Sequence, residues 1–159
     1  MICKILLFFL TLGFAMPLAS FAEDLYVVTS WDRSVLLDGC YVGKMDVTMS
    51  KDKSFKGREA TFQIKGEKLL SDFPKIGKMP GKIKIELPVR LLQNGVVTAQ
   101  PECIAGVMRM PLGIKLDLKL DALENARIIG NQIFFTLKVY SKFMGAKFPT
   151  TISFKGYKK

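Results

Sequence analysis

The stretch that decides the fold of this chain is Ile114-Lys115-Leu116-Asp117-Leu118-Lys119-Leu120. Its apolar and charged residues alternate without a break, and successive side chains of a β-strand point to opposite faces of the sheet. The same pattern returns in Lys82-Ile83-Lys84-Ile85-Glu86-Leu87. Each stretch predicts a strand that is covered on one face only. Such strands are typical of antiparallel sheets, because parallel sheets are usually buried on both faces.

Weaker alternation extends over most of the remaining chain. Four more segments have a predicted inner face, formed by Tyr41, Met45, Val47 and Met49; by Ala60, Phe62 and Ile64; by Ile133, Phe135, Leu137 and Val139; and by Phe148, Thr150, Ile152 and Phe154. Residues 25–31 and 102–110 add two predicted strands. Turn formers separate the segments, and Asn94-Gly95 is the strongest hairpin signal among them. Two segments resist this interpretation: a helical turn is expected within 67–76 and a short helix within 120–127.

About eight antiparallel strands with one apolar face each can hide those faces in two ways. They can close into a barrel, or they can pack as the two sheets of a sandwich. A barrel also removes exposed sheet edges. We therefore predict an all-β, antiparallel barrel of about eight strands, with an antiparallel sandwich as the alternative.

The first residues carry the pattern of a secretory signal peptide. Lys4 supplies a positive charge, residues 5–14 form an apolar run, and Ser20 and Ala22 are the small residues that precede a cleavage site. We expect cleavage after Ala22, a mature domain over 23–159, and a secreted or periplasmic location. The apolar run is shorter than the ~20 residues that a membrane-spanning helix needs. No comparable run follows, so no transmembrane anchoring is expected.

The chain is basic. It has 24 Lys and Arg against 14 Asp and Glu, a net charge of +10, and loss of Lys4 with the signal peptide leaves 23 against 14, or +9. A positive surface favours anionic partners, although nucleic acid is not expected as a partner outside the cytoplasm. Four lysines are predicted to point outward from the two clearest strands: Lys82, Lys84, Lys115 and Lys119. They form either a solvated face that opposes aggregation or a stripe for an anionic surface or protein partner, which Glu86 and Asp117 interrupt.

Two cysteines remain after cleavage, Cys40 and Cys103. An oxidising compartment would let them form a disulfide if their strands are neighbours. The alternative is two separate buried thiols, since free cysteine behaves as a small apolar residue.

No catalytic or metal-binding pattern is present. The chain has no histidine, which excludes Ser/His/Asp and Cys/His nucleophilic sites and the imidazole ligands of zinc. No two carboxylates are marked out for glycoside cleavage, so a hydrolase is the weakest hypothesis. We expect no enzymatic activity, no cofactor and no metal.

The aromatic and methionine residues on the predicted inner faces are the candidate ligand-binding set: Tyr41, Met45, Met49, Phe62, Phe135 and Phe148. Flexible thioethers and aromatic rings suit an adaptable apolar pocket. They suit a filled core equally well, because small barrels are often packed solid by side chains.

Several short patterns, taken in order, resemble one known family. They are Tyr41-Val42-Gly43-Lys44-Met45-Asp46-Val47, Ser71-Asp72-Phe73, Ile76-Gly77-Lys78-Met79-Pro80-Gly81-Lys82-Ile83, Ile129-Gly130-Asn131-Gln132-Ile133 and Ile152-Ser153-Phe154-Lys155-Gly156. Across residues 37–157 the chain resembles the calycin-like domain family of secreted bacterial proteins. The resemblance implies a lipocalin-related barrel, whose interior in related families often holds a small apolar molecule, but no known activity. The Gly-x-Trp signature of true lipocalins is absent, because Thr29 and Ser30 precede Trp31.

Two functional hypotheses follow. The leading one is a secreted, non-enzymatic binding protein that holds a small apolar or lipid-like ligand inside the barrel. The other is an envelope protein-interaction or structural domain with a filled core, which acts through its basic outer surface.

Overall fold

A computed structural model describes residues 38–50, 53–73 and 81–159 of the chain. These residues belong to one compact unit, Asp38–Lys159. The elements within it are β1 (Gly39–Ser50), β2 (Lys53–Ile64), β3 (Lys68–Phe73), β4 (Lys82–Pro88), β5 (Arg90–Leu91), β6 (Val97–Thr98), β7 (Ile104–Arg109), the 3-10 turn η1 (Pro111–Gly113), β8 (Lys115–Ile129), β9 (Gln132–Phe143) and β10 (Ala146–Lys158).

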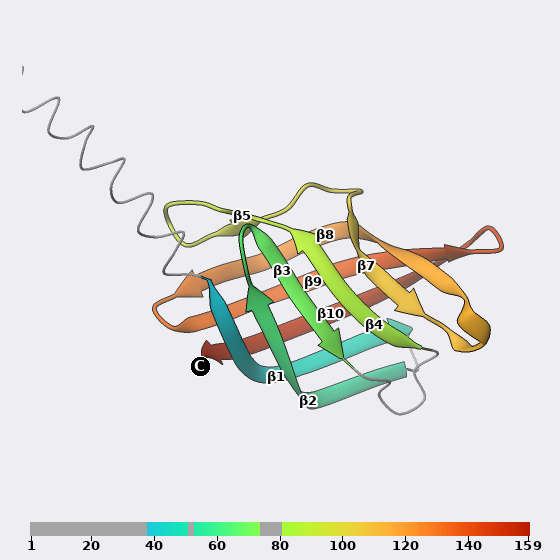
Figure 1. Ribbon diagram of the computed structural model, residues 1–159, viewed down its shortest axis with the longest axis horizontal. Helices are drawn as coiled ribbons and strands as arrows, with labels where there is room; N and C mark the ends of the chain where they lie inside the picture. Colours follow the sequence, from blue (N-terminus) through green and yellow to red (C-terminus); the bar gives the residue numbers. More distant parts are fainter. Residues whose placement is uncertain (1–37, 51–52, 74–80) are drawn as a thin grey trace, which may run out of the picture. The chain divides into compact units, whose positions relative to one another are not determined.

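Eight of these strands close into a barrel (Figure 1). The order around the barrel is β1-β10-β9-β8-β7-β4-β3-β2, with β2 paired back to β1, and every neighbouring pair is antiparallel. Strands β5 and β6 form a separate two-stranded hairpin. The predicted all-β antiparallel barrel is therefore confirmed, and the sandwich alternative was wrong.

The alternating residues lie where their pattern predicts. In β4, Ile83, Ile85 and Leu87 are buried, whereas Lys82 and Lys84 are exposed. The inner faces predicted for β1, β2, β9 and β10 are also buried, except for their members closest to one end of the barrel, Met49 and Phe148. The hydrophobic core is thus the barrel interior.

Within the described residues, neither segment that was expected to contain helix forms one, and residues 74–76 of the first segment lie outside the described residues. Residues 68–73 form β3, in which Leu69, Ser71 and Phe73 point inward. Residues 120–127 lie within β8, where the pairing with β9 shifts register between Leu120 and Ala122 and again between Glu124 and Arg127. A bulge inserts an extra residue and so interrupts the alternation of faces. These two bulges produced the spacing that we interpreted as helical.

The Asn94-Gly95 hairpin is confirmed, and it connects β5 to β6. Gly95 adopts φ +80° and its amide donates to the carbonyl of Leu92 at 3.0 Å, while the Asn94 side chain accepts from the amide of Val96 at 3.1 Å. The predicted signal peptide, the strand expected over 25–31 and Trp31 lie outside the described residues. In the ranges that are described, no helix has both the length and the apolar character needed to cross a membrane.

Four phenylalanine rings fill the middle of the barrel. The ring of Phe62 lies 4.6 Å from that of Phe154, 5.0 Å from that of Phe135 and 6.4 Å from that of Phe73, measured between centroids. The pair Phe62–Phe135 is edge-to-face, a favoured arrangement for aromatic rings. We call these four residues the aromatic cluster.

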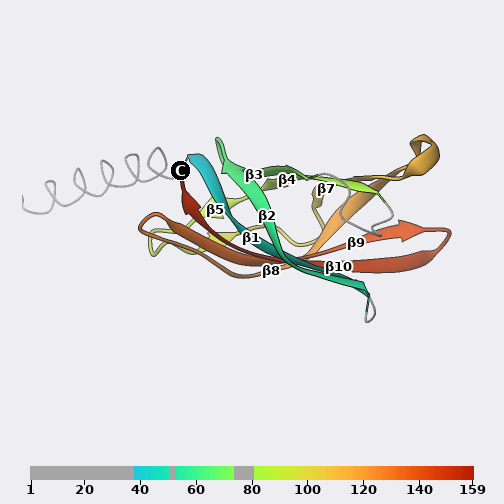
Figure 2. The ribbon, with the colours of Figure 1, turned by 90° about the horizontal axis from the view of Figure 1, so that it is seen from below.

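The barrel ladder is incomplete at one end. Strands β2 and β3 pair only through Gln63↔Leu70 and Ile64↔Leu69. The pairing of β8 with β9 stops at Lys119↔Tyr140, while residues 115–118 of β8 pair with β7 instead. Beyond these two points the strands separate into two leaves, with β3, β4, β7 and the start of β8 on one side and β2, β1, β10 and the end of β9 on the other (Figure 2). We call this the open end.

The aromatic cluster makes a first prediction about stability. Phe62→Ala should lower the free energy of unfolding by about 3–5 kcal/mol, because a fully buried ring is replaced by a cavity. Chemical denaturation of the purified protein measures this change.

Phe148→Ala is the matched control, since the Phe148 side chain is 50% exposed at the open end. It should cost about 1 kcal/mol or less, because half of that ring already contacts water. Equal losses for the two variants would contradict a solid aromatic core.

Candidate functional site

The end of the barrel opposite the open end is closed by the β5–β6 hairpin and the segments beside it. Val89 and Val97 are buried there, Val96 forms a bridge with Arg127 of β8, and the amide of Ile128 donates to the carbonyl of Gly95 at 2.8 Å. Only about 10 Å³ of space remains beneath the hairpin. This cavity is too small for a ligand.

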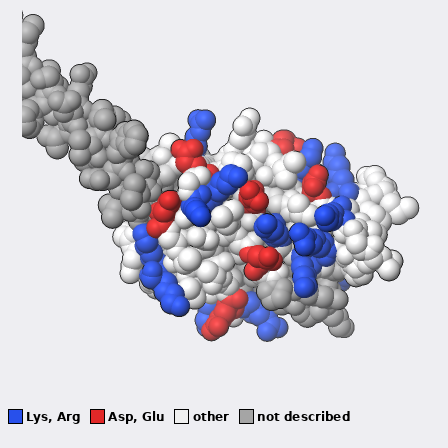
Figure 3. All heavy atoms as spheres, viewed as in Figure 1, with Lys and Arg blue, Asp and Glu red and all other residues white. Residues whose placement is uncertain are grey.

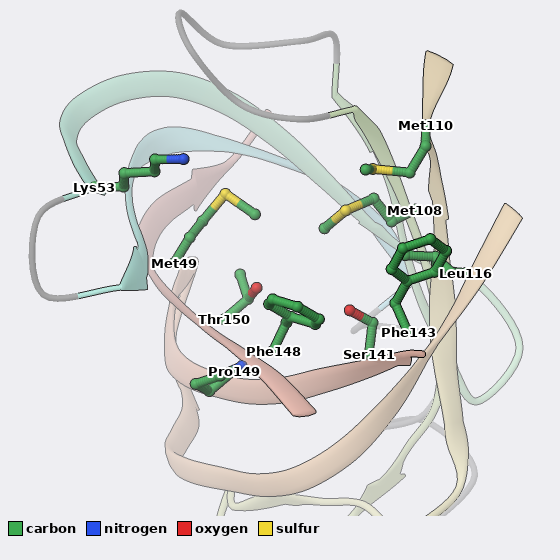
Figure 4. A pocket seen from close by; sticks show the side chains of 10 residues that line it. All are labelled: Met49, Lys53, Met108, Met110, Leu116, Ser141, Phe143, Phe148, Pro149 and Thr150. Carbon is green, nitrogen blue, oxygen red and sulfur yellow. The ribbon is translucent and has the colours of Figure 1, made fainter. Parts of the chain in front are cut away.

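A pocket of about 340 Å³ occupies the open end, between the two leaves (Figure 4). One leaf contributes Met108, Met110 and Leu116, and Figure 4 shows Met108 and Met110 across the pocket from Met49 of the other leaf. The remaining lining residues come from β2, β9 and β10, and they are Lys53, Ser141, Phe143, Phe148, Pro149 and Thr150. The pocket therefore exists because β2 leaves β3 and β8 leaves β9.

The wall of this pocket is mostly apolar but holds three polar groups. Ser141 and Thr150 are buried residues of β9 and β10, and Figure 4 shows both hydroxyl groups directed into the pocket. The ammonium group of Lys53 lies in the same view on the side of Met49. Apolar walls with a few placed polar groups are the usual composition of a small-molecule site.

The six predicted ligand-binding residues divide between core and pocket. Tyr41, Met45, Phe62 and Phe135 are fully or almost fully buried and fill the barrel. Burial raises the pKa of the Tyr41 phenol, and the carboxylate of Asp38 raises it further. Only Met49 and Phe148 line the pocket. The other four residues belong to a filled core, which was the alternative interpretation of these aromatic and methionine side chains.

Sequence reasoning missed most of the pocket. Met108, Met110 and Leu116 have the alternating spacing of inner-face residues, and that signal was available in the predicted strands. Alternation gives the face of the sheet on which a residue lies. It does not give the distance of that residue from the end of the barrel, which decides between core and pocket.

The four predicted outward lysines are all exposed, but they do not form one stripe on adjacent strands. Strand β7 lies between β4 and β8 and contributes Arg109, which pairs with Lys82 on one side and with Lys115 on the other. The result is a row of three cations, Lys82, Arg109 and Lys115, across three strands at the open end. None of these cations, nor Lys84 or Lys119, has an ion pair within 4.0 Å among the described residues.

A second pocket, of about 320 Å³, lies on the outer side of the seam where β8 and β9 separate. Its lining includes Lys115, Lys119 and Lys142 together with Asp117 and Tyr140. The Tyr140 hydroxyl donates to Glu102 Oε2 at 2.5 Å, and this hydrogen bond raises the pKa of the phenol. Figure 3 shows Lys and Arg side chains gathered beside the uncharged open end.

Cys40 and Cys103 are free thiols. Cys40 lies on β1 and Cys103 directly precedes β7, and three barrel strands separate β1 from β7 in either direction. The structure therefore has two separate thiols in place of the disulfide, although Cys40 is exposed where we expected a buried residue. Burial raises the pKa of the Cys103 thiol.

Comparisons of the chain with protein-family models, with curated proteins and with solved structures found no match. Within the described ranges, His, Cys, Asp and Glu residues form no group of three that would hold a metal ion.

The two thiols yield a second prediction. Alkylation under denaturing, non-reducing conditions should modify both Cys40 and Cys103, as counted by peptide mass spectrometry. In the native protein Cys40 should react faster, because Cys103 is half-buried and its raised pKa keeps more of it in the unreactive thiol form.

The native rate at Cys103 should rise with pH, as its thiolate fraction increases. The variant Cys40→Ser isolates this slower reaction. If Cys40 and Cys103 of the denatured protein reacted only after a reductant was added, the assignment of both residues as free thiols would be contradicted.

Proposed function

We propose that this chain is a secreted, non-enzymatic binding protein that holds a small apolar or lipid-like ligand in the pocket at the open end of its barrel. The observation that carries the proposal is the pocket itself, about 340 Å³ of mostly apolar space between the two leaves. This volume lies at the lower end of the range of about 300–1,000 Å³ typical of ligand pockets. It fits a small ligand or one end of a longer one.

The side chains around the pocket support an adaptable site. Met49, Met108 and Met110 are unbranched and polarisable, so they can adjust to ligands of different shape. The hydroxyls of Ser141 and Thr150 offer hydrogen bonds, and Lys53 supplies a positive charge. An amphiphile with an apolar body and a polar or anionic head satisfies all of these groups.

Secretion and membership of the calycin-like family belong to the same proposal. The short patterns of residues 37–157 support the family, and the charged, apolar and small residues of 1–22 support export. Apolar ligands need a carrier in water, and a pocket that excludes water from their surface supplies one.

Occupation of the pocket gives the third prediction. Met110→Trp should weaken uptake of an apolar fluorescent probe at least tenfold, because the indole fills space that the probe needs. Met144→Trp is the matched control: Met144 belongs to the same end of the barrel but does not line the pocket, so uptake should be unchanged.

Probe emission under direct excitation measures uptake, and native mass spectrometry of the purified protein tests for a co-purifying ligand. No uptake by the unsubstituted protein, together with no ligand, would overturn the proposal. It would leave the alternative of an interaction domain with a filled core that acts through its surface.

Export gives the fourth prediction. Protein recovered from outside the cytoplasm should begin at Glu23, as determined by N-terminal sequencing and intact mass. Ala22→Trp should block this cleavage, because the peptidase requires a small residue there, whereas Phe21→Leu should not. Recovery of a chain that still begins at Met1 would contradict the proposal.

A further inference from the structure

Two loops at the open end carry apolar side chains in water. The loop between β7 and β8 holds Leu112, which is 98% exposed, and the loop between β9 and β10 holds Met144, which is 90% exposed. They are the two most exposed large apolar residues of the described chain. Figures 1 and 2 both place these loops at the same end of the barrel.

The backbone at both positions disfavours the residue that is present. Leu112 has φ +65° and Met144 has φ +49°, and each precedes a glycine that also has positive φ. Glycine and asparagine adopt this left-handed region most readily, whereas other side chains are strained in it. Neither folding nor packing accounts for Leu112 or Met144, because their backbone is strained and their side chains lie almost fully in water.

The exposed apolar surface continues from these tips to the mouth of the pocket. Three more large apolar residues of the same end are partly exposed, namely Ile114, Phe143 and Phe148. Phe143 and Phe148 also line the pocket. We call the five residues the apolar rim: Leu112, Ile114, Phe143, Met144 and Phe148. Exposed apolar clusters with a polar border mark sites of protein or membrane interaction.

Cations border the apolar rim. Arg109 and Lys115 directly precede and follow the β7–β8 loop, and Lys82 of β4 lies beside Arg109. Lys142 lies near the end of β9, just before the β9–β10 loop. In Figure 3 the uncharged right-hand end of the molecule is bordered by Lys and Arg side chains. This arrangement complements an anionic lipid surface, whose headgroups attract Lys and Arg while its interior accepts apolar side chains.

We propose that the apolar rim docks onto an anionic lipid bilayer, with Leu112 and Met144 inserted at the headgroup boundary and the neighbouring cations against the lipid phosphates. The two tips project from separate loops. A fluid bilayer can accept both tips without shape complementarity. This inference goes beyond ligand binding and holds even for an empty pocket, but it also places the pocket mouth at the source of an apolar ligand.

Sedimentation with sucrose-loaded vesicles tests the docking. The processed protein should bind vesicles that contain phosphatidylglycerol and phosphatidylcholine, and should bind vesicles of phosphatidylcholine alone at least tenfold more weakly. Replacing Leu112→Asn together with Met144→Asn should weaken binding to the anionic vesicles at least tenfold. Asparagine tolerates positive φ, so this variant should fold at least as stably as the original.

Matched variants at other places exclude general effects. Leu92→Asn with Ile129→Asn removes two exposed apolar residues of the closed end and should leave vesicle binding unchanged. Lys82→Glu with Lys115→Glu should weaken vesicle binding and reduce the dependence of binding on salt concentration. Lys65→Glu with Lys155→Glu changes the net charge by the same amount and should have a much smaller effect. Residues 23–37 are the same in every processed variant.

The outcomes separate docking from ligand binding. The double asparagine variant should lose vesicle binding but keep probe uptake. Met110→Trp should lose probe uptake but keep vesicle binding. Absence of binding to anionic vesicles, or binding that the double asparagine variant retains, would overturn the inference. Equal retention of the original and the double asparagine variant on a soluble polyanion, without vesicle binding, would instead assign the cations to a glycan or protein partner.

Discussion

The aromatic cluster is the constraint on which the rest of this structure depends. Phe62 contacts rings from β3, β9 and β10, so strands from both sides of the barrel are held around one buried residue. The β5–β6 hairpin covers the closed end, and the pocket of about 340 Å³ lies beyond the cluster at the other end. The cluster therefore determines both the stability of the barrel and the depth of its pocket.

The pocket follows from where the ladder stops. Backbone groups of a closed barrel pair with both neighbours, but β2 leaves β3 after two paired positions and β8 leaves β9 at Lys119. Strands without these hydrogen bonds can separate, and their inner faces then line a space in place of a packed core. Regions with few ladder bonds also open at lower free energy than the rest of a protein. The end that holds the pocket is thus the end best able to admit a ligand.

Much of this fold was predictable from alternation, and the exceptions have physical causes. The pattern of 82–87 and 114–120 placed every lysine outward, because a strand with one buried face allows no other register. The bulges in β8 concealed a strand, since they interrupt the alternation that identifies one. Alternation also grouped Met45 with Met49, although the first is core and the second lines the pocket. Their difference lies along the barrel axis, and only the closure of the barrel determines it.

Leu112 and Met144 break two local rules at once, since each is apolar in water and each is strained at positive φ. Violations of local consistency gather at functional positions, where a requirement other than folding selects the residue. Here both occur on loops at the end of the barrel that holds the pocket of about 340 Å³, and the cations of three strands lie near the same end. An apolar ligand that moves between a bilayer and such a pocket does so most readily along a route that does not expose it to water. A rim that enters lipid supplies that route, so the strained tips, the cations and the pocket have a common explanation.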